Sequence, residues 1–139
     1  MAVVSLRSVG DRYTTQITTQ HHSLVADEPP PAGEDMGPSP YELLLGALGS
    51  CTSMTLLMYA RRRGWPLTEV RVELTHDRDY AQDCEDCEDQ GARIEAIQRR
   101  IHLEGPLTDE QRERLLLAAA HCPVHKTLAA APRVLDSLV

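Results

Sequence analysis

The chain has 139 residues, of which 42% are hydrophobic and 25% are charged, so we expect a single globular domain spanning residues 1–139. A formal net charge of −7 and the lack of a basic stripe exclude a typical nucleic-acid-binding protein. The N-terminus has no long apolar run after a basic start, so we expect a cytoplasmic protein, where four cysteines indicate redox chemistry or metal binding more than structural disulfides.

Three strands are expected in the N-terminal part of the chain. Val3–Val9 and Tyr13–Gln20 are rich in strand-forming residues and flank the turn residues Gly10 and Asp11. A shorter third strand is expected near residues 24–25. The stretch that follows, DEPPPAGEDMGPSP, is rich in proline and glycine and is therefore predicted to be a connector.

The first predicted helix contains Leu43–Ala60, eighteen residues without a charge. Ser39 is placed to be its N-cap, Pro40 takes the first helical position and Glu42 completes a capping box; the helix should end near Gly64. Because glycine, serine and threonine dilute its apolar run, we expect no membrane span. A helix that is apolar on every side should be buried on every side, which in a chain of this size requires a second subunit.

The remaining elements follow in the order strand, strand, helix, strand. Residues 70–75 alternate between apolar and polar, and residues 94–103 suggest a second strand, with DCEDCED between them as a loop. Thr108 and Gln111 can cap a second helix, which Pro123 interrupts, and RVLDSLV suggests a closing strand. The order βββ-α-ββ-α-β predicts an α+β fold.

Two cysteines stand in contrasting surroundings. The apolar neighbours of Cys51 disfavour a thiolate, and the N-terminus of its helix is too distant to help, so a reactive Cys51 needs a cation from elsewhere in the fold. Taken alone, it is more simply a packing residue. Cys122, in HCPVHKT, has His121, His125 and Lys126 nearby to favour a thiolate, although a helix-end cysteine without a role explains it as well.

Cys84 and Cys87 form a CxxC pair among acidic residues. The acidic neighbours would raise both thiol pKa values, and no strand-then-helix pattern follows, which argues against a thioredoxin-like site. As half of a zinc site, the pair would need two further ligands, for which His121 and His125 are the formal candidates. An accessory thiol pair and the absence of any chemical role are the other interpretations.

Two longer motifs join Cys51 to Cys122. They are GPSPYELLLGALGSC, which ends at Cys51, and LLLAAAHCPVHKTL, in which Cys122 follows 71 positions later. With these motifs the chain resembles the OsmC/Ohr family of thiol-dependent peroxidases over nearly its whole length. The resemblance implies an OsmC-like intertwined homodimer, in which two helices pack centrally against the surrounding sheets. We expect no cofactor and no metal.

The resemblance also implies a mechanism. The thiolate of Cys51 would attack an organic hydroperoxide and become a sulfenic acid, Cys122 would condense with it to a redox-active disulfide, and a dithiol reductant would restore both thiols. An apolar pocket suits this chemistry because it favours organic hydroperoxides and excludes water. Such an activity would serve the response to oxidative stress.

The family's Glu–Arg pair is only partly recognisable. Tyr41 stands where the resemblance expects the glutamate, and the carboxylate is shifted to Glu42, while Arg12 in GDRY is the best match to the arginine. Glu42 and Cys51 would lie about 13.5 Å apart along one helix and on opposite faces, so a working pair must come from the other subunit. The alternative function is a non-catalytic dimer that binds a small apolar or thiol-reactive ligand or senses redox state.

Overall fold

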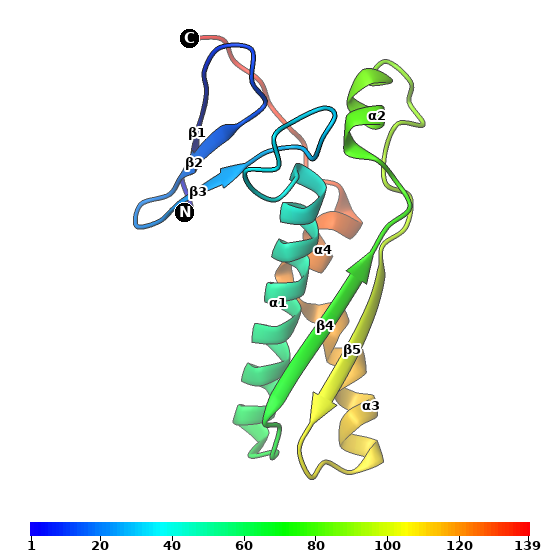
Figure 1. Ribbon diagram of the computed structural model, residues 1–139. Coiled ribbons are helices and arrows are strands. Elements are labelled where there is room, and N and C mark those ends of the chain that lie inside the picture. Colours follow the sequence, from blue (N-terminus) through cyan, green and yellow to red (C-terminus); the bar gives the residue numbers. More distant parts are fainter. The chain divides into compact units, whose positions relative to one another are not determined.

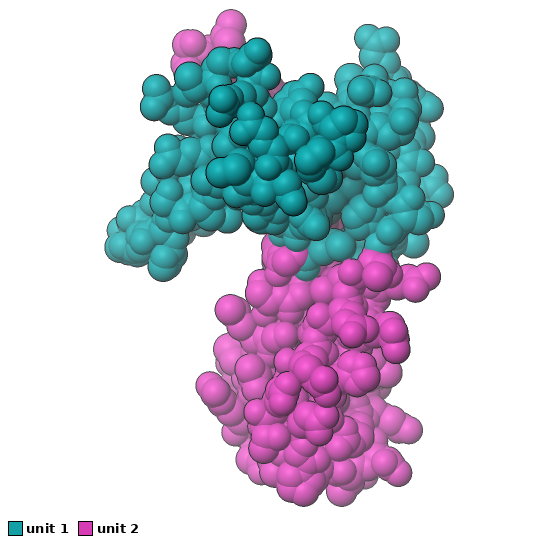
Figure 2. Space-filling view, in the orientation of Figure 1, with its two compact units in different colours: residues 1–45, 76–97 teal, residues 46–75, 98–139 magenta.

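The computed structural model describes residues 1–139, which divide into two compact units (Figure 2). Unit 1 contains Met1–Leu45 and His76–Ile97, and unit 2 contains Gly46–Thr75 and Gln98–Val139. Each unit is therefore built from two separate segments of the chain, and the single domain spanning residues 1–139 stays a prediction.

Unit 1 contains a three-stranded antiparallel sheet in the order β1-β2-β3 (Figure 1). Its strands are β1 (Ser5–Ser8), β2 (Thr15–Thr18) and β3 (Ser23–Ala26), which fall inside or beside the predicted segments. Ile17 on the central strand faces Leu6 on β1 and Leu24 on β3. The sheet therefore has one short apolar row across all three strands, with Ile17 its buried member.

Helix α1 (Pro40–Arg63) begins and ends where the sequence predicts. At its start the backbone N–H of Ser39 donates to Glu42 Oε2 at 2.8 Å, and the N–H of Glu42 donates to Ser39 Oγ at 3.2 Å, which completes the predicted capping box. At its end Gly64 has φ +66°, the left-handed conformation in which glycine commonly stops a helix.

Unit 2 packs α1 against a two-stranded antiparallel sheet and a second long helix. Strands β4 (Glu69–Thr75) and β5 (Gln98–Glu104) pair along their full lengths, and alternate residues of each are half-buried. Helix α3 (Asp109–Ala118) has the predicted capping box between Thr108 and Gln111. The buried core of the unit joins α1 to α3 and the turn after it, through Leu56, Ala60, Leu115, Ala118 and Ala119.

Helix α1 is long and apolar enough to cross a membrane by length and composition alone, with a mean hydropathy of 1.5 in its most apolar window. Glycine, serine and threonine lie within that window, and Leu56 and Ala60 are core residues of unit 2. The opposite side of the helix is uncovered in one chain, where Met54 and Met58 are 63% and 52% exposed.

The α+β class is confirmed, but three local predictions are wrong. The segment predicted as a loop around DCEDCED begins inside a short helix, α2 (Tyr80–Glu85), which the Asp79 side chain caps. The predicted second helix gives way to a 3-10 turn, η1 (Ala119–His121), and Pro123 starts a further helix, α4 (Pro123–Ala130). Residues 131–139 form no strand and pair with none of the strands of the chain.

Candidate functional site

The structure brings Cys51 and Cys122 together within unit 2. Two successive backbone N–H groups at the start of α4 donate to the two sulfurs: Val124 N–H to Cys51 Sγ at 3.5 Å, and His125 N–H to Cys122 Sγ at 3.4 Å. Both cysteines are free thiols; Cys51 is half-buried and Cys122 is fully buried. A residue in the middle of α1 and one 71 positions later therefore form a single dithiol site.

The backbone around Cys122 explains how its sulfur is held. Cys122 is the N-cap of α4 and Pro123 is the first helical residue, an arrangement that needs no N–H from proline. The first N–H groups of a helix have no acceptor within the helix. The N–H of His125 is one of these groups, and it donates to Cys122 Sγ at 3.4 Å. The sequence motif CPVH therefore starts a helix and directs backbone donors at a sulfur.

The two thiols differ in their ease of ionisation. Burial raises the pKa of Cys51, and its hydrogen bond to Cys122 raises it further. Burial also opposes ionisation of Cys122, but the neighbouring Cys51 thiol and the backbone N–H groups of His125 and Val124 outweigh it and lower the pKa of Cys122.

A guanidinium lies beside this pair, from a residue that the sequence analysis missed. Arg99 on β5 donates through Nη1 to Thr52 Oγ1 at 2.9 Å and through Nη2 to His125 Nδ1 at 3.1 Å. The fully buried hydroxyl of Thr52 donates to the carbonyl oxygen of Leu48 at 2.7 Å. One signal was available, since Arg99 shares its strand face with the half-buried residue Ile101.

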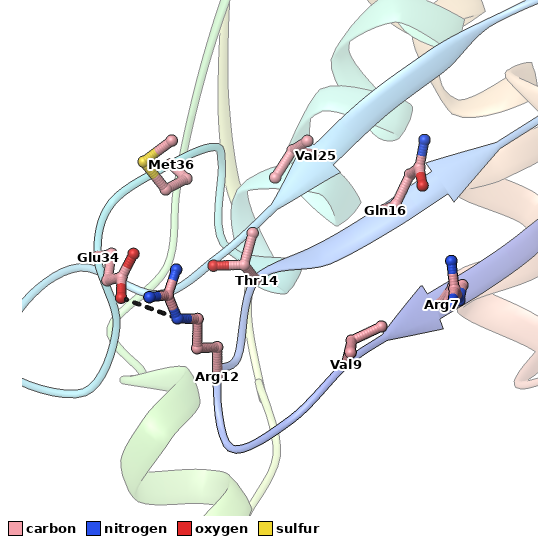
Figure 3. Close-up of a pocket in the computed structure, with 8 residues that line it drawn as sticks. All are labelled: Arg7, Val9, Arg12, Thr14, Gln16, Val25, Glu34 and Met36. Carbon is pink, nitrogen blue, oxygen red and sulfur yellow. Dashed lines mark ion pairs between the residues drawn. The ribbon is translucent and has the colours of Figure 1, made fainter.

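Arg12, the predicted arginine, belongs to unit 1 and lies between β1 and β2. Its Nε is 3.6 Å from Glu34 Oε1, and both side chains are more than half exposed. Figure 3 shows this ion pair at one end of a cavity of about 390 Å³ that the sheet residues Gln16 and Val25 also line. The structure therefore gives Arg12 a carboxylate partner within its own unit.

Glu42 and Tyr41 lie at the start of α1, also in unit 1. Glu42 is the capping-box residue described above, and its side chain is exposed. The hydroxyl of Tyr41 donates to Asp83 Oδ2 at 2.5 Å, and burial together with this bond raises the pKa of Tyr41 to about 12. Arg78 donates to the other oxygen of Asp83 through Nε at 2.9 Å. The residue that stands where the resemblance expects a glutamate therefore contacts a carboxylate–guanidinium pair.

Cys84 and Cys87 are exposed free thiols. Asp83, the residue before Cys84, is the buried member of α2 and anchors that helix to Tyr41. No group of three or more His, Cys, Asp or Glu side chains is arranged to hold a metal ion. The acidic cysteine segment is therefore tied to α1 by its aspartate, not by its sulfurs.

Unit 1 also contains a larger cavity of about 600 Å³. It extends from the sheet to α2 and the first turns of α1, and among the residues that line it are Arg12, Tyr13, Ile17, Leu43, Tyr80 and Cys84. One buried oxygen on its wall, Glu28 Oε1, has no hydrogen-bond partner. Burial raises the pKa of Glu28, and the negative charge of nearby carboxylates raises it further.

Comparisons with known proteins agree with this architecture. The family model described as OsmC-like protein matches residues 33–135. The chain is similar to an OsmC-like protein from Mycoplasma pneumoniae, with a TM-score of 0.76, 16% identity and coverage of 94% of this chain and 89% of that one. No match is found among curated proteins.

Two further structural neighbours are described as hydroperoxide resistance proteins. One is the organic hydroperoxide resistance protein OsmC from Legionella pneumophila, with a TM-score of 0.67, 16% identity and coverage of 92% and 88% of the two chains. The other is the organic hydroperoxide resistance protein OhrB of Bacillus subtilis, with a TM-score of 0.61, 20% identity and coverage of 94% and 92%. At these identities the likeness establishes the fold, and the family match over residues 33–135 establishes the family: the chain belongs to the OsmC-like proteins.

Proposed function

We propose that this protein is a thiol-dependent peroxidase that reduces organic hydroperoxides through Cys51 and Cys122. The observation that carries the proposal is that the sulfurs of Cys51 and Cys122 accept hydrogen bonds from successive backbone N–H groups at the start of α4, which brings two distant parts of the sequence into one partly buried site. Two neighbouring thiols can form a disulfide with little backbone movement. The hydroperoxide resistance proteins among the structural neighbours support the choice of substrate class.

The reaction balances with one proton on the thiol pair. As Cys51 loses its proton, its sulfur attacks the terminal oxygen of the hydroperoxide ROOH, the O–O bond breaks, and the leaving alkoxide takes up a proton to give ROH. Cys51 is then a sulfenic acid. The thiolate of Cys122 attacks that sulfur, the S–S bond forms, the S–O bond breaks, and the released hydroxide is protonated to water. A dithiol reductant exchanges with the disulfide and restores both thiols.

The complete site requires a homodimer in this proposal. The exposed methionines on α1 give a second subunit an apolar face to cover, as the family resemblance implies. Arg12 and Glu42 of the second subunit would then lie at Cys51, and the 600 Å³ cavity beside Arg12 would hold the organic part of the substrate, since its size suits a small molecule. We place the reaction in the cytoplasm, where free thiols persist.

Thiol counting tests the chemistry directly. One equivalent of cumene hydroperoxide added to the reduced protein should remove two free thiols, and peptide mapping should find them joined as Cys51–Cys122. The variant Cys122→Ser should instead accumulate a sulfenic acid on Cys51 that dimedone traps, while the double variant Cys84→Ser/Cys87→Ser should behave as the wild type. Full turnover by Cys51→Ser would eliminate the peroxidase.

Substitution of Arg12 tests the contribution from the second subunit. We expect Arg12→Gln to lower the second-order rate constant for cumene hydroperoxide by about tenfold or more, because a guanidinium stabilises the thiolate and the developing charge. Arg7→Gln is the matched control, since Arg7 lines the same smaller cavity as Arg12. Equal rates for the two variants would remove Arg12 from the site.

The second candidate function is a non-catalytic dimer that binds a small apolar or thiol-reactive ligand or senses redox state. Two observations favour it: Tyr41 replaces the glutamate that the resemblance expects, and burial raises the pKa of Cys51. A sensor would form the Cys51–Cys122 disulfide once and turn over poorly with any dithiol reductant. Sustained peroxide consumption with excess dithiothreitol, lost in Cys51→Ser, separates the enzyme from the sensor.

A further inference from the structure

One face of helix α2 lines the larger cavity of unit 1, which has a volume of about 600 Å³. The residues of α2 on the cavity wall are Tyr80, Ala81, Cys84 and Glu85. Two neighbouring residues followed by two more one turn later form a single face of a helix. Cys84 therefore lies on the cavity wall, whereas Cys87, the other free thiol of the segment, is not among the lining residues. Of these two exposed cysteines, only Cys84 borders a space that can hold a small molecule.

The position of Cys84 is fixed by the residue before it. Asp83 is buried, accepts a hydrogen bond from the Tyr41 hydroxyl and pairs with Arg78 through Nε at 2.9 Å. The Asp79 side chain caps the start of the helix. Because Asp83 and Cys84 are consecutive residues of one helix, the contacts of Asp83 also hold the backbone of Cys84 in place.

The charges on the cavity wall are mostly negative. The charged residues that line the cavity are Arg12, Asp27, Glu28 and Glu85. The single cation among them, Arg12, already has a carboxylate partner, since its Nε lies 3.6 Å from Glu34 Oε1. A cavity whose walls carry an excess of one charge attracts ligands of the opposite charge. This cavity therefore favours a cationic ligand.

Glu28 differs from the neighbouring carboxylate in having no partner. Asp27 accepts hydrogen bonds from the Thr14 hydroxyl and from the backbone N–H groups of Glu28 and Met36, at distances of 3.0, 2.8 and 3.2 Å. Glu28 is only 9% exposed, belongs to none of the ion pairs of the chain, and its Oε1 is buried without a hydrogen-bond partner. An unpaired buried oxygen is costly, and an ammonium group on a ligand would supply the missing donor.

We propose that this cavity binds a low-molecular-weight disulfide that carries ammonium groups, and that Cys84 exchanges with it. The thiolate of Cys84 attacks one sulfur of the disulfide RSSR, the Cys84–SR bond forms as the S–S bond of RSSR breaks, and the released thiolate RS⁻ takes up the proton that Cys84 gave up. The acidic neighbours of Cys84 oppose its thiolate in the free protein, and the ammonium groups of the bound disulfide offset that repulsion. Neither Cys51 nor Cys122 takes part, so the inference does not rest on the proposed peroxidase.

Two disulfides of opposite charge test the proposal. Cystamine and dithiodipropionic acid have the same two-carbon spacers, and they carry ammonium and carboxylate groups, respectively. Cys87→Ser leaves Cys84, and Cys84→Ser leaves Cys87, as the one thiol of the tryptic peptide that follows Arg78, in which mass spectrometry measures the rate of mixed-disulfide formation. Both thiols lie in the same acidic segment, so cystamine should react faster with both. We expect its advantage over dithiodipropionic acid to be about tenfold larger at Cys84 than at Cys87.

Matched variants of the cavity wall make the outcome specific. Glu28→Gln should lower the rate of cystamine at Cys84 by about fivefold or more, whereas Glu95→Gln, an exposed carboxylate of unit 1 that does not line the cavity, should not. Ala81→Phe should slow the same reaction because it fills the cavity from α2. Gln82→Phe, on an exposed position of the same helix that does not line the cavity, is its control.

The results separate this inference from the proposed function, since no peroxide is added. An equal advantage of cystamine at Cys84 and Cys87, or equal rates in Glu28→Gln and Glu95→Gln, overturns the proposal. Should Glu28→Gln fail to fold, equal rates in Ala81→Phe and Gln82→Phe overturn it in the same way. Selective exchange at Cys84 in a protein that consumes no hydroperoxide supports the proposal and leaves only the peroxidase overturned.

Discussion

Asp83 is a single carboxylate that connects two elements of unit 1. It accepts a hydrogen bond from the Tyr41 hydroxyl and pairs with Arg78. The bond to Arg78 and, to a smaller extent, the bond to Tyr41 lower the pKa of Asp83. Both partners favour the ionised form, so the contact is strongest when Asp83 is charged. The cysteine segment that follows Asp83 is thereby held to the start of α1.

The contact of Asp83 with Tyr41 and Arg78 should make the stability of the folded protein depend on pH. The folded-state pKa of Asp83 is depressed, so its stabilising contribution is present above the unfolded-state value of about 3.9 and is lost as pH falls through the folded value. Asp83→Asn should therefore lower the urea midpoint at pH 7 and lose most of its difference from wild type in strong acid. Glu88→Gln, an exposed carboxylate of the same segment, is the control; a constant difference across pH would refute the linkage.

For Arg99, the sequence predicts which face of its strand the residue occupies but not which residues it contacts. Arg99, Ile101 and Leu103 are alternate residues, so they lie on the same, packed face of β5. The pattern within this one strand is enough to predict that placement. The contacts of Arg99 with Thr52 and His125 join α1, β5 and α4, and no periodicity within one element predicts such a meeting. The cysteine partnership was accessible from the sequence only through the two family motifs, for the same reason.

At the scale of elements, helix starts were the most predictable features. Ser39 with Glu42 and Thr108 with Gln111 form the capping boxes that their spacing indicates, because a capping box depends on four consecutive residues alone. The start of α4 was misassigned as an interruption. Pro123 is equally compatible with the end of one helix and the start of the next, and the distinction depends on where the chain packs.

The capping box of α1 can be tested separately from any chemistry at Glu42. Ser39→Ala should lower the free energy of unfolding by about 1 kcal/mol, because it removes the side-chain acceptor at the N-cap. Glu42→Gln should leave it nearly unchanged, since glutamine also completes a capping box. Chemical denaturation of both variants measures this, and a loss in Glu42→Gln as large as in Ser39→Ala would show that the charge, not the cap, stabilises the helix.

Cys122 has a structural role at α4 as well as its proposed chemical one. Serine is a preferred N-cap and alanine is not, so Cys122→Ala should be less stable than Cys122→Ser by about 1 kcal/mol. Thermal unfolding of the two reduced variants measures the difference. Equal stability would mean that a side-chain acceptor at position 122 adds nothing to the helix, and that the trapping variant gains no benefit from its hydroxyl.

The C-terminal residues show where a local pattern fails. RVLDSLV has the apolar content of a strand, yet Val134, Leu135 and Leu138 are all more than 80% exposed. A strand needs a neighbour for its backbone hydrogen bonds, and residues 131–139 pair with none of the strands, although both sheets have open edges. Alternation of apolar residues predicts that a segment can be a strand, whereas pairing with another strand depends on where the segment lies in the fold.

At the scale of the whole molecule, the uncovered side of α1 argues for self-association. Met54 and Met58 are large apolar side chains exposed on a helix that a single chain leaves mostly open. Water contact with such a face is unfavourable, at about 25 cal/mol per Å² of apolar surface. The expected homodimer would cover it.

Substitution of Met58 tests this expectation. Analytical ultracentrifugation should find the wild type as a dimer and Met58→Asp shifted towards monomer, with the dissociation constant raised by about tenfold or more, because a buried unpaired charge is costly. Met58→Leu keeps the apolar surface and should remain dimeric. A wild-type monomer at high concentration would contradict the proposed dimer and, with it, any contribution of Arg12 across the interface.

The contact between the two sulfurs bears on how the protein would withstand an excess of oxidant. Irreversible damage to a sulfenic acid requires a second molecule of peroxide to arrive and carry the sulfur on to sulfinic acid. The neighbouring thiol needs no arrival, since well-placed groups within one molecule react as if present at about 10⁵ M or more. Because both sulfurs lie at the start of α4, disulfide formation should outpace overoxidation in the proposed reaction, and inactivation should stay slow even when peroxide greatly exceeds protein.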